Sequence, residues 1–254
     1  MTQPGPGPLP TGDAHEPERP GQPARDRAAE LAANLAEVRA RIAAACRGSG
    51  RTPDEVALIA VTKTFPASDV RLLATLGVSD IGESRDQEGR EKAAACADLD
   101  LSWHFVGQLQ TNKARSVASY ASAVHSVDRH SLVTALDRGA AASGRILRCL
   151  VQVRLDDRPG RGGAVPVDVA ALADAIAEAD ALELRGVMAV APLGADPGPA
   201  FDRLAGIAAE VRSRHAGASW MSAGMSDDLE AAVAAGATHV RVGRGLLGVR
   251  PSSR

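Results

Sequence analysis

Short apolar runs alternate with longer amphipathic runs along most of the chain. An apolar run bounded by turn signals is typical of a buried strand, whereas apolar residues spaced three and four positions apart predict a helix. Strands are therefore expected at residues 57–62, 78–82, 101–106, 122–127, 147–155, 184–190, 218–222 and 238–243. Helices are expected between them, at about 67–76, 85–97, 110–120, 129–143, 166–180, 198–215 and 227–235.

Strands that alternate with helices in this way predict a parallel α/β architecture. The 254 residues are also close to the length that one eight-fold barrel needs. We therefore expect an α/β fold that is a single (β/α)8 TIM barrel with an extra N-terminal helix. An open doubly wound sheet is the alternative, which so many similar units make less favourable.

The N-terminal region divides into a polar segment and a helix. Residues 1–24 contain seven prolines and four glycines with almost no apolar residues, so this segment cannot bury enough surface to offset its ordering entropy. From Ala24 to Arg47 the pattern is helical, with one apolar stripe formed by Leu31, Leu35, Val38 and Ile42. Residues 1–24 are predicted to be a disordered tail, and residues 25–254 to be the barrel domain.

Composition narrows the classes of function. Hydrophobic residues make up 45% of the chain and aromatic residues 2%, so alanine, valine and leucine must build the core. A net charge of −2 offers no basic surface for nucleic acid or for an anionic membrane. No apolar segment approaches the ~18 residues of a membrane span, and the N-terminus lacks the apolar stretch of a secretory signal. We expect a cytoplasmic protein with no nucleic-acid or membrane partner.

The spacing of cysteine and histidine residues argues against a disulfide framework and against a metal site. Cys46, Cys96 and Cys149 are odd in number and widely spaced, which favours reduced thiols in the cytoplasm. The six histidines show no metal-ligand spacing. No metal is therefore expected.

In a (β/α)8 barrel, function lies in the loops that follow the carboxyl ends of the strands. Lys63 occupies that position after the first strand. A lysine desolvated at the mouth of a buried strand has its charged form disfavoured, so its amine becomes more nucleophilic and suits a Schiff base. Taken alone, a solvated lysine at the start of a loop would explain the same residue.

The loops after the seventh and eighth strands suit a phosphate group. Ser226 precedes the expected helix at 227–235 and is predicted to be its N-cap, where free N–H groups and the helix dipole favour an anion. Gly243 and Gly245 allow backbone N–H groups to approach an anion closely, although they would also serve as plain turn residues. The pattern Gly243–x–Gly–x–x–Gly248 is not a dinucleotide fingerprint, because six residues follow it and no βαβ unit can.

Two further residues bear on this end of the barrel. Arg241 lies inside the last strand, where a buried arginine is rare and needs an acceptor. His104 alternates with Trp103 and Phe105, so it points to the opposite face, either into the core or toward the site. The acids of residues 82–88 are general acid–base candidates, or more commonly the first turn of a helix. A lysine amine, a phosphate cradle and a buried arginine together predict a site for a phosphorylated aldehyde, with pyridoxal 5′-phosphate (PLP) the first candidate.

Five sequence segments, in order, resemble the pyridoxal phosphate homeostasis protein family, whose members are single-domain barrels similar to the N-terminal domain of alanine racemase. They are AVTKTFP around Lys63, IGESRDQE at 81–88, WHFVGQLQTNK at 103–113, SAGMSDDLEAAVAAG at 222–236 and THVRVGRGLLG at 238–248. The resemblance covers about residues 30 to 250.

The resemblance implies a role for each matching position. Lys63 would form the Schiff base with PLP. Arg241 would face the pyridine nitrogen, which disfavours protonation of that nitrogen and makes the ring a weaker electron sink. The other residues expected to bind the cofactor are Ser226, Gly243 and Arg244 around the phosphate, together with Ser84, His104 and Met225.

The chain departs from the family pattern at four positions. Ser84 stands where asparagine is usual, Gln108 where histidine is frequent, and Ala223 where methionine is usual. Arg244 stands where Ser or Thr is common, so a hydroxyl contact to the phosphate is lost, and a guanidinium that turned inward would compensate. Cofactor binding is still expected, with an altered set of contacts.

The resemblance implies a monomeric PLP carrier that limits free aldehyde and supplies PLP-dependent apo-enzymes, without robust turnover of its own. A PLP-dependent amino-acid racemase is one alternative, but alanine racemases use a second base, a tyrosine from a separate domain. This chain ends at Arg254 with no such domain, and its one tyrosine, Tyr120, falls in a helix. A Schiff-base aldolase acting on a phosphorylated sugar and a barrel that presents its surface to a protein partner are the remaining alternatives.

Overall fold

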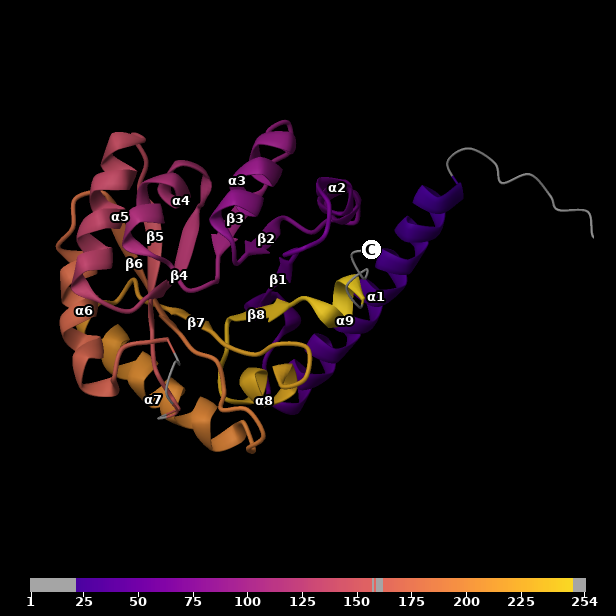
Figure 1. The fold of residues 1–254 in the computed structure, drawn as a ribbon. Coiled ribbons are helices and arrows are strands. Elements are labelled where there is room, and N and C mark those ends of the chain that lie inside the picture. Colours follow the sequence, from indigo (N-terminus) through magenta and orange to yellow (C-terminus); the bar gives the residue numbers. More distant parts are fainter. Residues whose placement is uncertain (1–21, 157, 159–161, 249–254) are drawn as a thin grey trace, which may run out of the picture.

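In the computed structural model, which describes residues 22–156, 158 and 162–248, the strands close into a parallel barrel (Figure 1). Each strand pairs with the next in sequence, and β8 pairs with β1 to complete the ring. The strands are β1 (Ala57–Val61), β2 (Asp80–Glu83), β3 (Ser102–Phe105), β4 (Ala123–Val127), β5 (Leu147–Gln152), β6 (Leu182–Met188), β7 (Trp220–Ser222) and β8 (His239–Val242). The predicted (β/α)8 barrel is confirmed, and an open sheet is ruled out by the closure.

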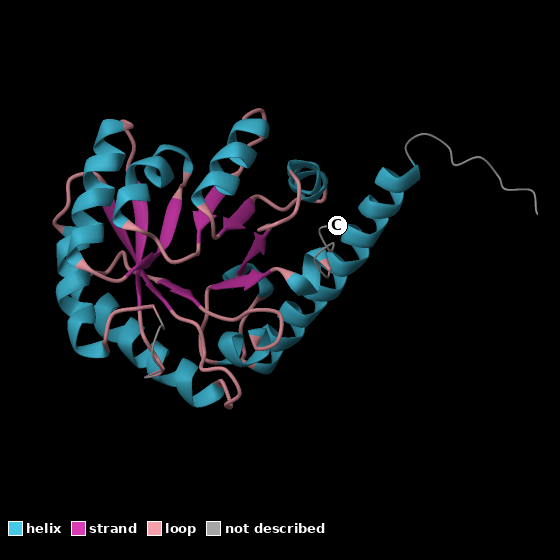
Figure 2. Cartoon of the chain, viewed as in Figure 1, coloured by secondary structure: helices cyan, strands magenta, loops and turns pink. Residues whose placement is uncertain are grey.

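Helices form an outer layer around the strands, as Figure 2 shows. Each helical run expected from the sequence contains one of them. They are α2 (Ala67–Thr75), α3 (Asp86–Ala95), α4 (Ala114–Tyr120), α5 (His130–Ala142), α6 (Val169–Ala177), α7 (Gly198–Arg214) and α8 (Leu229–Ala234), with short 3-10 turns η1 (Pro53–Glu55), η2 (Thr111–Lys113) and η3 (Pro166–Asp168). The sequence pattern did not predict α9 (Arg244–Leu247), because four residues are too few to show a helical period.

The extra N-terminal helix, α1 (Gln22–Gly48), lies along the outside of the barrel beside α8 and α9 (Figure 1). Its predicted apolar stripe is buried and shares a hydrophobic cluster with residues of α8 and α9. The disorder predicted for residues 1–24 concerns mainly residues 1–21, which lie outside the described part, whereas Gln22–Ala24 already belong to α1.

The apolar core occupies the layer between the strands and the surrounding helices. It consists largely of alanine, valine and leucine, as the composition requires, with Phe105 and Phe201 among its largest fully buried side chains. Trp103 also packs in this layer, whereas His104 points the opposite way, as strand alternation predicts. Consequently the interior of the barrel is available to polar side chains, which the site uses.

Three general features bear on function. No helix in the described part of the chain is long and apolar enough to cross a membrane. Within the same residues, no group of three or more His, Cys, Asp or Glu side chains is arranged to hold a metal ion. Cys46, Cys96 and Cys149 are buried, and their thiols are free.

Candidate functional site

A pocket of about 660 Å³ opens at the carboxyl ends of the strands. Its lining comes from loops that follow five strands: β1, β2, β3, β6 and β7, with β8 and its loop forming the remaining wall. The residues predicted from the sequence that line it are Lys63, Ser84, Met225, Ser226, Arg241, Gly243 and Arg244. These residues are distant in sequence, and they meet because parallel strands place all their carboxyl ends at one end of the barrel.

Lys63 stands in a tight turn just beyond β1. The N–H of Phe65 donates to the carbonyl of Thr62 over 3.0 Å, which places Lys63 and Thr64 at the centre of the turn. Thr64 has a φ of +69°, an uncommon value for a β-branched residue, so neighbouring groups must hold the turn. Lys63 itself is exposed at the pocket mouth. The predicted desolvation of its amine is therefore wrong for this structure, because the turn lifts the side chain clear of the buried strand.

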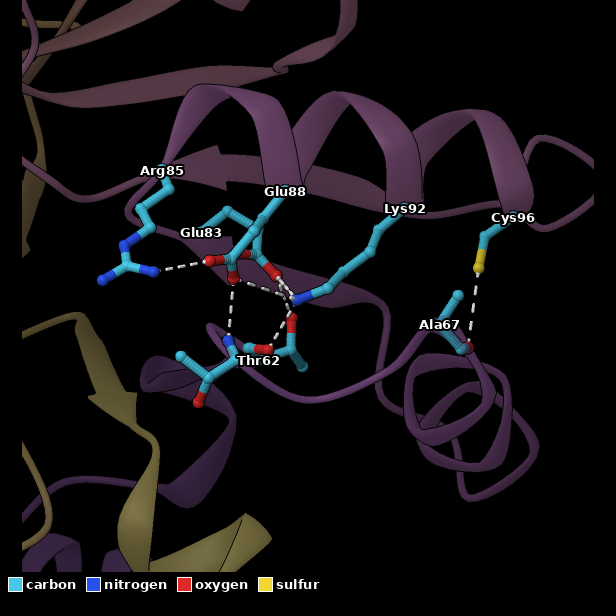
Figure 3. A network of polar contacts seen from close by, with 8 residues as sticks. Thr62, Ala67, Glu83, Arg85, Glu88, Lys92 and Cys96 are labelled. Carbon is cyan, nitrogen blue, oxygen red and sulfur yellow. Dashed lines mark hydrogen bonds and ion pairs between the residues drawn. The ribbon is translucent and has the colours of Figure 1, made fainter. Parts of the chain in front are cut away.

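Side chains of β2 and α3 hold the backbone on both sides of Lys63. Lys92 donates to the carbonyl of Thr62 over 2.7 Å, and Glu88 accepts the N–H of Thr64 over 2.8 Å. Figure 3 shows the side chains of Glu83 and Lys92 meeting at Thr62, with Glu88 beside them. Because both peptide groups that flank Lys63 are fixed from one helix, α3 sets the backbone position from which the Lys63 side chain extends.

Glu83 is the buried centre of this arrangement. Its Oε1 accepts hydrogen bonds from Lys92 and from the Thr62 hydroxyl, each over 2.6 Å. Burial raises the pKa of the Glu83 carboxyl above its usual value, although Lys92 and Thr62 favour the charged form. Of the acids of residues 82–88, Glu83 and Glu88 thus support the Lys63 turn, while Asp86 accepts a hydrogen bond from Ser116.

The loop after β7 forms the wall that carries Met225 and Ser226. Gly224 has a φ of +90°, and a Cβ added there would lie 2.7 Å from the Cβ of Ala232, so only glycine fits. Ser226 was predicted to be the N-cap of the following helix, and this is wrong. A turn intervenes, α8 begins at Leu229, and its N-cap position is Asp228. The Ser226 hydroxyl instead accepts the N–H of Gly245, over 3.0 Å, and so ties this loop to α9.

Helix α1 supports the same wall from outside. Arg41 donates to the carbonyl of Ser226 over 2.9 Å. Asn34 and Arg27 donate to the carbonyls of Leu246 and Leu247, each over 3.0 Å, and so satisfy the C-terminal end of α9. The N-terminal helix therefore does more than cover the barrel, because it holds the two loops that were expected to receive a phosphate.

Arg244 lies at the pocket rim with its guanidinium turned outward. Its Nη2 pairs with Asp227 Oδ2 over 2.8 Å, and both side chains are well exposed. An inward guanidinium that would replace a lost hydroxyl contact is therefore not the arrangement seen. Gly243 and Ser226 also line this wall, together with the acids Asp227 and Asp228.

Arg241 is a buried cation among the pocket-lining residues. Its Nη1 donates to Ser222 Oγ over 2.8 Å, and its Nη2 donates to the carbonyl of Ala189 over 2.9 Å. Burial lowers the pKa of Arg241 to about 10, which the carboxylate of Asp228 partly opposes, so the side chain remains charged at neutral pH. Of its five side-chain N–H groups, two have an acceptor among the described residues, which leaves donors for a ligand.

His104 is the predicted site residue that the structure does not bring to the pocket. It is buried inside the barrel, where its ring nitrogens lie 2.9 Å from His125 Nε2 and 2.9 Å from Asp80 Oδ1. Asp80 begins β2, so His104 reaches toward the end of the barrel opposite the pocket. Direct contact with a ligand in the pocket is therefore not supported for His104.

Sequence reasoning missed two parts of the site. The loop after β6 contributes residues 190–195 and Pro197 to the pocket, and its place after a strand was the signal available. Gly107, in the loop after β3, also lines the pocket, and a Cβ there would lie 2.3 Å from the carbonyl oxygen of Ser84. No local pattern reveals such a contact, because the two residues come from different loops.

Comparison with known proteins agrees with this fold. The family "Alanine racemase, N-terminal domain" matches residues 28–251. A pyridoxal phosphate homeostasis protein of Mycobacterium bovis is 46% identical over 244 residues, covering 89% of this chain and 95% of its own. The structure of PipY from Synechococcus elongatus PCC7942 with PLP bound is 36% identical, with a TM-score of 0.76, and covers 86% of this chain and 100% of that chain.

An alanine racemase structure provides a more distant comparison. The enzyme from Streptomyces coelicolor A3(2) is 20% identical, with a TM-score of 0.70. The alignment covers 88% of this chain and 59% of the racemase. At this level of identity the similarity establishes a shared barrel fold and nothing about the reaction.

Proposed function

Because the chain belongs to the pyridoxal phosphate homeostasis protein family and matches the alanine racemase N-terminal domain, we propose that it binds PLP in this pocket through a Schiff base to Lys63. The observation that carries the proposal is the meeting of an accessible amine and a buried guanidinium in one pocket. In the bond-forming step, the Lys63 nitrogen replaces the aldehyde oxygen, a C=N bond replaces C=O, and one water leaves.

The residues of the pocket fit the three polar parts of PLP. Lys63 supplies a primary amine for the aldehyde, and Ser226 with the Gly243 backbone suits the phosphate. Arg241 has uncommitted N–H donors for the pyridine nitrogen, which is an acceptor when it is unprotonated. The volume of about 660 Å³ lies within the range of small-molecule sites.

Arg241 also favours a carrier over a carbanion enzyme. PLP, when bound, supplies an electron sink whose strength depends on a protonated ring nitrogen. A guanidinium that is charged at neutral pH opposes the protonation of a ring nitrogen beside it. We therefore infer that the protein holds and supplies PLP in intracellular homeostasis and has little turnover of its own.

Racemisation of the kind catalysed by alanine racemases needs a tyrosine as second base, and no tyrosine is among the described residues that line the pocket. The one tyrosine, Tyr120, is in α4, its hydroxyl is buried, and it does not line the pocket. Burial raises the pKa of this hydroxyl far above its usual value, which also makes it a poor base at neutral pH. A racemase-like activity stays the alternative reading of the same Schiff base.

The proposal extends to the cellular compartment of the protein and to its partners. We place the protein in the cytoplasm, where three unpaired, buried cysteines are compatible with a reducing environment. We also propose that PLP-dependent apo-enzymes receive the cofactor from a monomeric carrier. The open pocket mouth with its exposed lysine supports release, because transfer requires access to the C=N bond.

The direct test is the visible absorption spectrum of the purified protein after addition of PLP and dialysis. A yellow band is expected, and borohydride should remove it by reducing the C=N bond to a stable amine. Peptide mass analysis should then find the pyridoxyl group on the peptide that contains Lys63. A protein that remains colourless would overturn the proposal and favour a Schiff-base aldolase, which binds no chromophore.

Replacement of Arg241 should weaken PLP binding. An Arg241→Met variant loses the charged donors to the ring, so the dissociation constant should rise about ten- to a hundredfold. Arg241→Lys keeps the charge without the planar fork and should recover part of the affinity. Fluorescence titration with PLP measures both, and circular dichroism confirms folding. An unchanged dissociation constant in Arg241→Met would contradict the assigned contact to the ring.

A further inference from the structure

Buried polar side chains form a continuous hydrogen-bonded network through the barrel interior. Asp80 Oδ1 lies 2.9 Å from His104 Nε2, and His104 Nδ1 lies 2.9 Å from His125 Nε2. His125 Nδ1 lies 2.9 Å from Ser222 Oγ, which accepts from Arg241 Nη1 over 2.8 Å. This interior network, formed by Asp80, His104, His125, Ser222 and Arg241, joins the amino-terminal end of β2 to the pocket.

Hydrogen-bond chemistry orients every proton in the interior network. Arginine can only donate, so Ser222 Oγ accepts from Arg241, and His125 Nδ1 is the one acceptor among the described residues for the Ser222 hydroxyl proton. Burial, with a further contribution from the charge of Arg241, lowers the pKa of His125 well below its usual value, so this ring is neutral. Its single proton is therefore on Nε2 and is donated to His104 Nδ1.

The hydrogen bond between His104 and Asp80, at the end of the network away from Arg241, has the same donor-to-acceptor direction. Burial opposes ionisation of Asp80, but hydrogen bonds from His104 and Ser79 outweigh it, so the pKa of this carboxyl is lowered. The ionised carboxylate accepts from His104 Nε2–H. A doubly protonated His104 would reverse both histidine bonds and leave the Ser222 hydroxyl proton without an acceptor among the described residues. The donors therefore all point from a cation toward an anion.

The orientation of the interior network bears on how the buried charge of Arg241 is stabilised. No carboxylate hydrogen-bonds to the Arg241 side chain among the described residues, and an uncompensated buried charge is costly. Asp228 is the carboxylate that favours the charged form of Arg241. His239 lies beside the network but is not part of it, because its ring bonds to Thr238. Arg185 lies over Trp220 at the same end as Asp80. Aligned dipoles that end on Asp80 offer Arg241 a second, remote source of stabilisation.

We propose that Asp80, His104, His125 and Ser222 are positioning residues that orient Arg241 and stabilise its charge from across the barrel, and thereby set how strongly it holds the cofactor ring. The ligand in this statement rests on the proposed function, whereas the orientation of Arg241 does not. None of these four residues lines the pocket, so they act on the ligand only through Arg241. His104, which does not line the pocket, would thus affect the ligand through Arg241.

An Asp80→Asn variant isolates the remote charge, because asparagine keeps an acceptor for His104 and removes the carboxylate. Asp174→Asn is the matched control. Asp174 also accepts from a histidine, His215, over 2.8 Å, but it lies on α6 outside the barrel. The PLP dissociation constant should rise roughly three- to tenfold in Asp80→Asn, as expected for coupled groups of one network, and should not change in Asp174→Asn.

Nitrogen-15 NMR of the histidine rings tests the network without PLP. His104 and His125 should both be neutral with the proton on Nε2, and the Arg241 Nε–H signal, assigned by its loss in Arg241→Lys, should shift in Asp80→Asn. A proton on Nδ1 of His125, or an Arg241 Nε–H signal with the same chemical shift in Asp80→Asn as in the wild type, would overturn the proposal. If the wild-type protein bound no PLP, the proposed function would fail, and these spectra would still decide the network.

Ser222→Ala cuts the interior network where it meets Arg241. Ser126→Ala is its control, because Ser126 is also buried in a barrel strand but its hydroxyl has no hydrogen-bond partner in the described structure. Ser222→Ala should weaken PLP binding and shift the Arg241 signal, whereas Ser126→Ala should do neither. Threonine at position 222 retains a hydroxyl and should restore both. Equal behaviour of the two alanine variants would contradict a positioning role.

Discussion

A Lys63→Ala variant is expected to lose all covalently attached PLP while keeping its fold. The amine of Lys63 is the pocket's accessible primary amine, so no other group there can form the C=N bond. Because the side chain is exposed, its removal should change the free energy of unfolding by less than about 0.5 kcal/mol. The measurements are the absorption band after PLP addition and the pyridoxyl mass after borohydride reduction.

The small number of lysines in the chain makes the site of PLP attachment easy to identify. Three lysines are present: Lys63, Lys92 and Lys113. Lys92 is buried in its ion pair with Glu83, and Lys113 lies outside the pocket, in η2. Lys113→Ala is therefore the matched control and should keep the yellow band. A band that persists in Lys63→Ala and maps to another lysine would remove Lys63 from the site.

A Lys92→Met variant should lose about 3–5 kcal/mol of stability, because it leaves the Glu83 carboxylate buried without its cation. It also removes the donor to the Thr62 carbonyl, so the strained turn at Thr64 loses one of its two supports. We therefore expect slower attachment of PLP to Lys63 as well as a lower denaturation midpoint. Urea unfolding measures the stability, and the rate of appearance of the absorption band measures the attachment.

Two further variants separate charge burial from general damage. Adding Glu83→Gln to Lys92→Met removes the stranded charge and should restore more than half of the lost stability. Arg71→Met breaks the exposed ion pair with Asp98 and should cost less than about 1 kcal/mol. The explanation would be wrong if Lys92→Met were as stable as the wild type, or if the double variant recovered nothing.

Local sequence was sufficient for the architecture and for much of the pocket. The largely apolar runs located every strand, because the face of each strand that packs against the surrounding helices must be apolar. The barrel rule then placed Lys63, Arg241 and the loops at one end, because the carboxyl ends of parallel strands coincide. Helix α9 was missed since its four residues carry no period, although it forms part of the pocket wall.

Predictions about side-chain environment were less successful. The sequence suggested a desolvated Lys63 and a capping Ser226, and both were wrong, because each depends on how a loop turns after its strand. His104 was assigned to the ligand from its place in a strand near the mouth. Its true partners, Asp80 and His125, come from the neighbouring strands β2 and β4.

By itself, the sequence determined the barrel, the end of the barrel that carries the site, and the amine and guanidinium that define its chemistry. These follow from local periodicity and from a topological rule, neither of which requires knowledge of distant contacts. Only the tertiary structure decided that α1 holds α9, that α3 holds the Lys63 turn, and that His125 meets Ser222, 97 residues away. Such contacts arise from ring closure and strand register, and a buried polar group shows its partner only when the chain has folded.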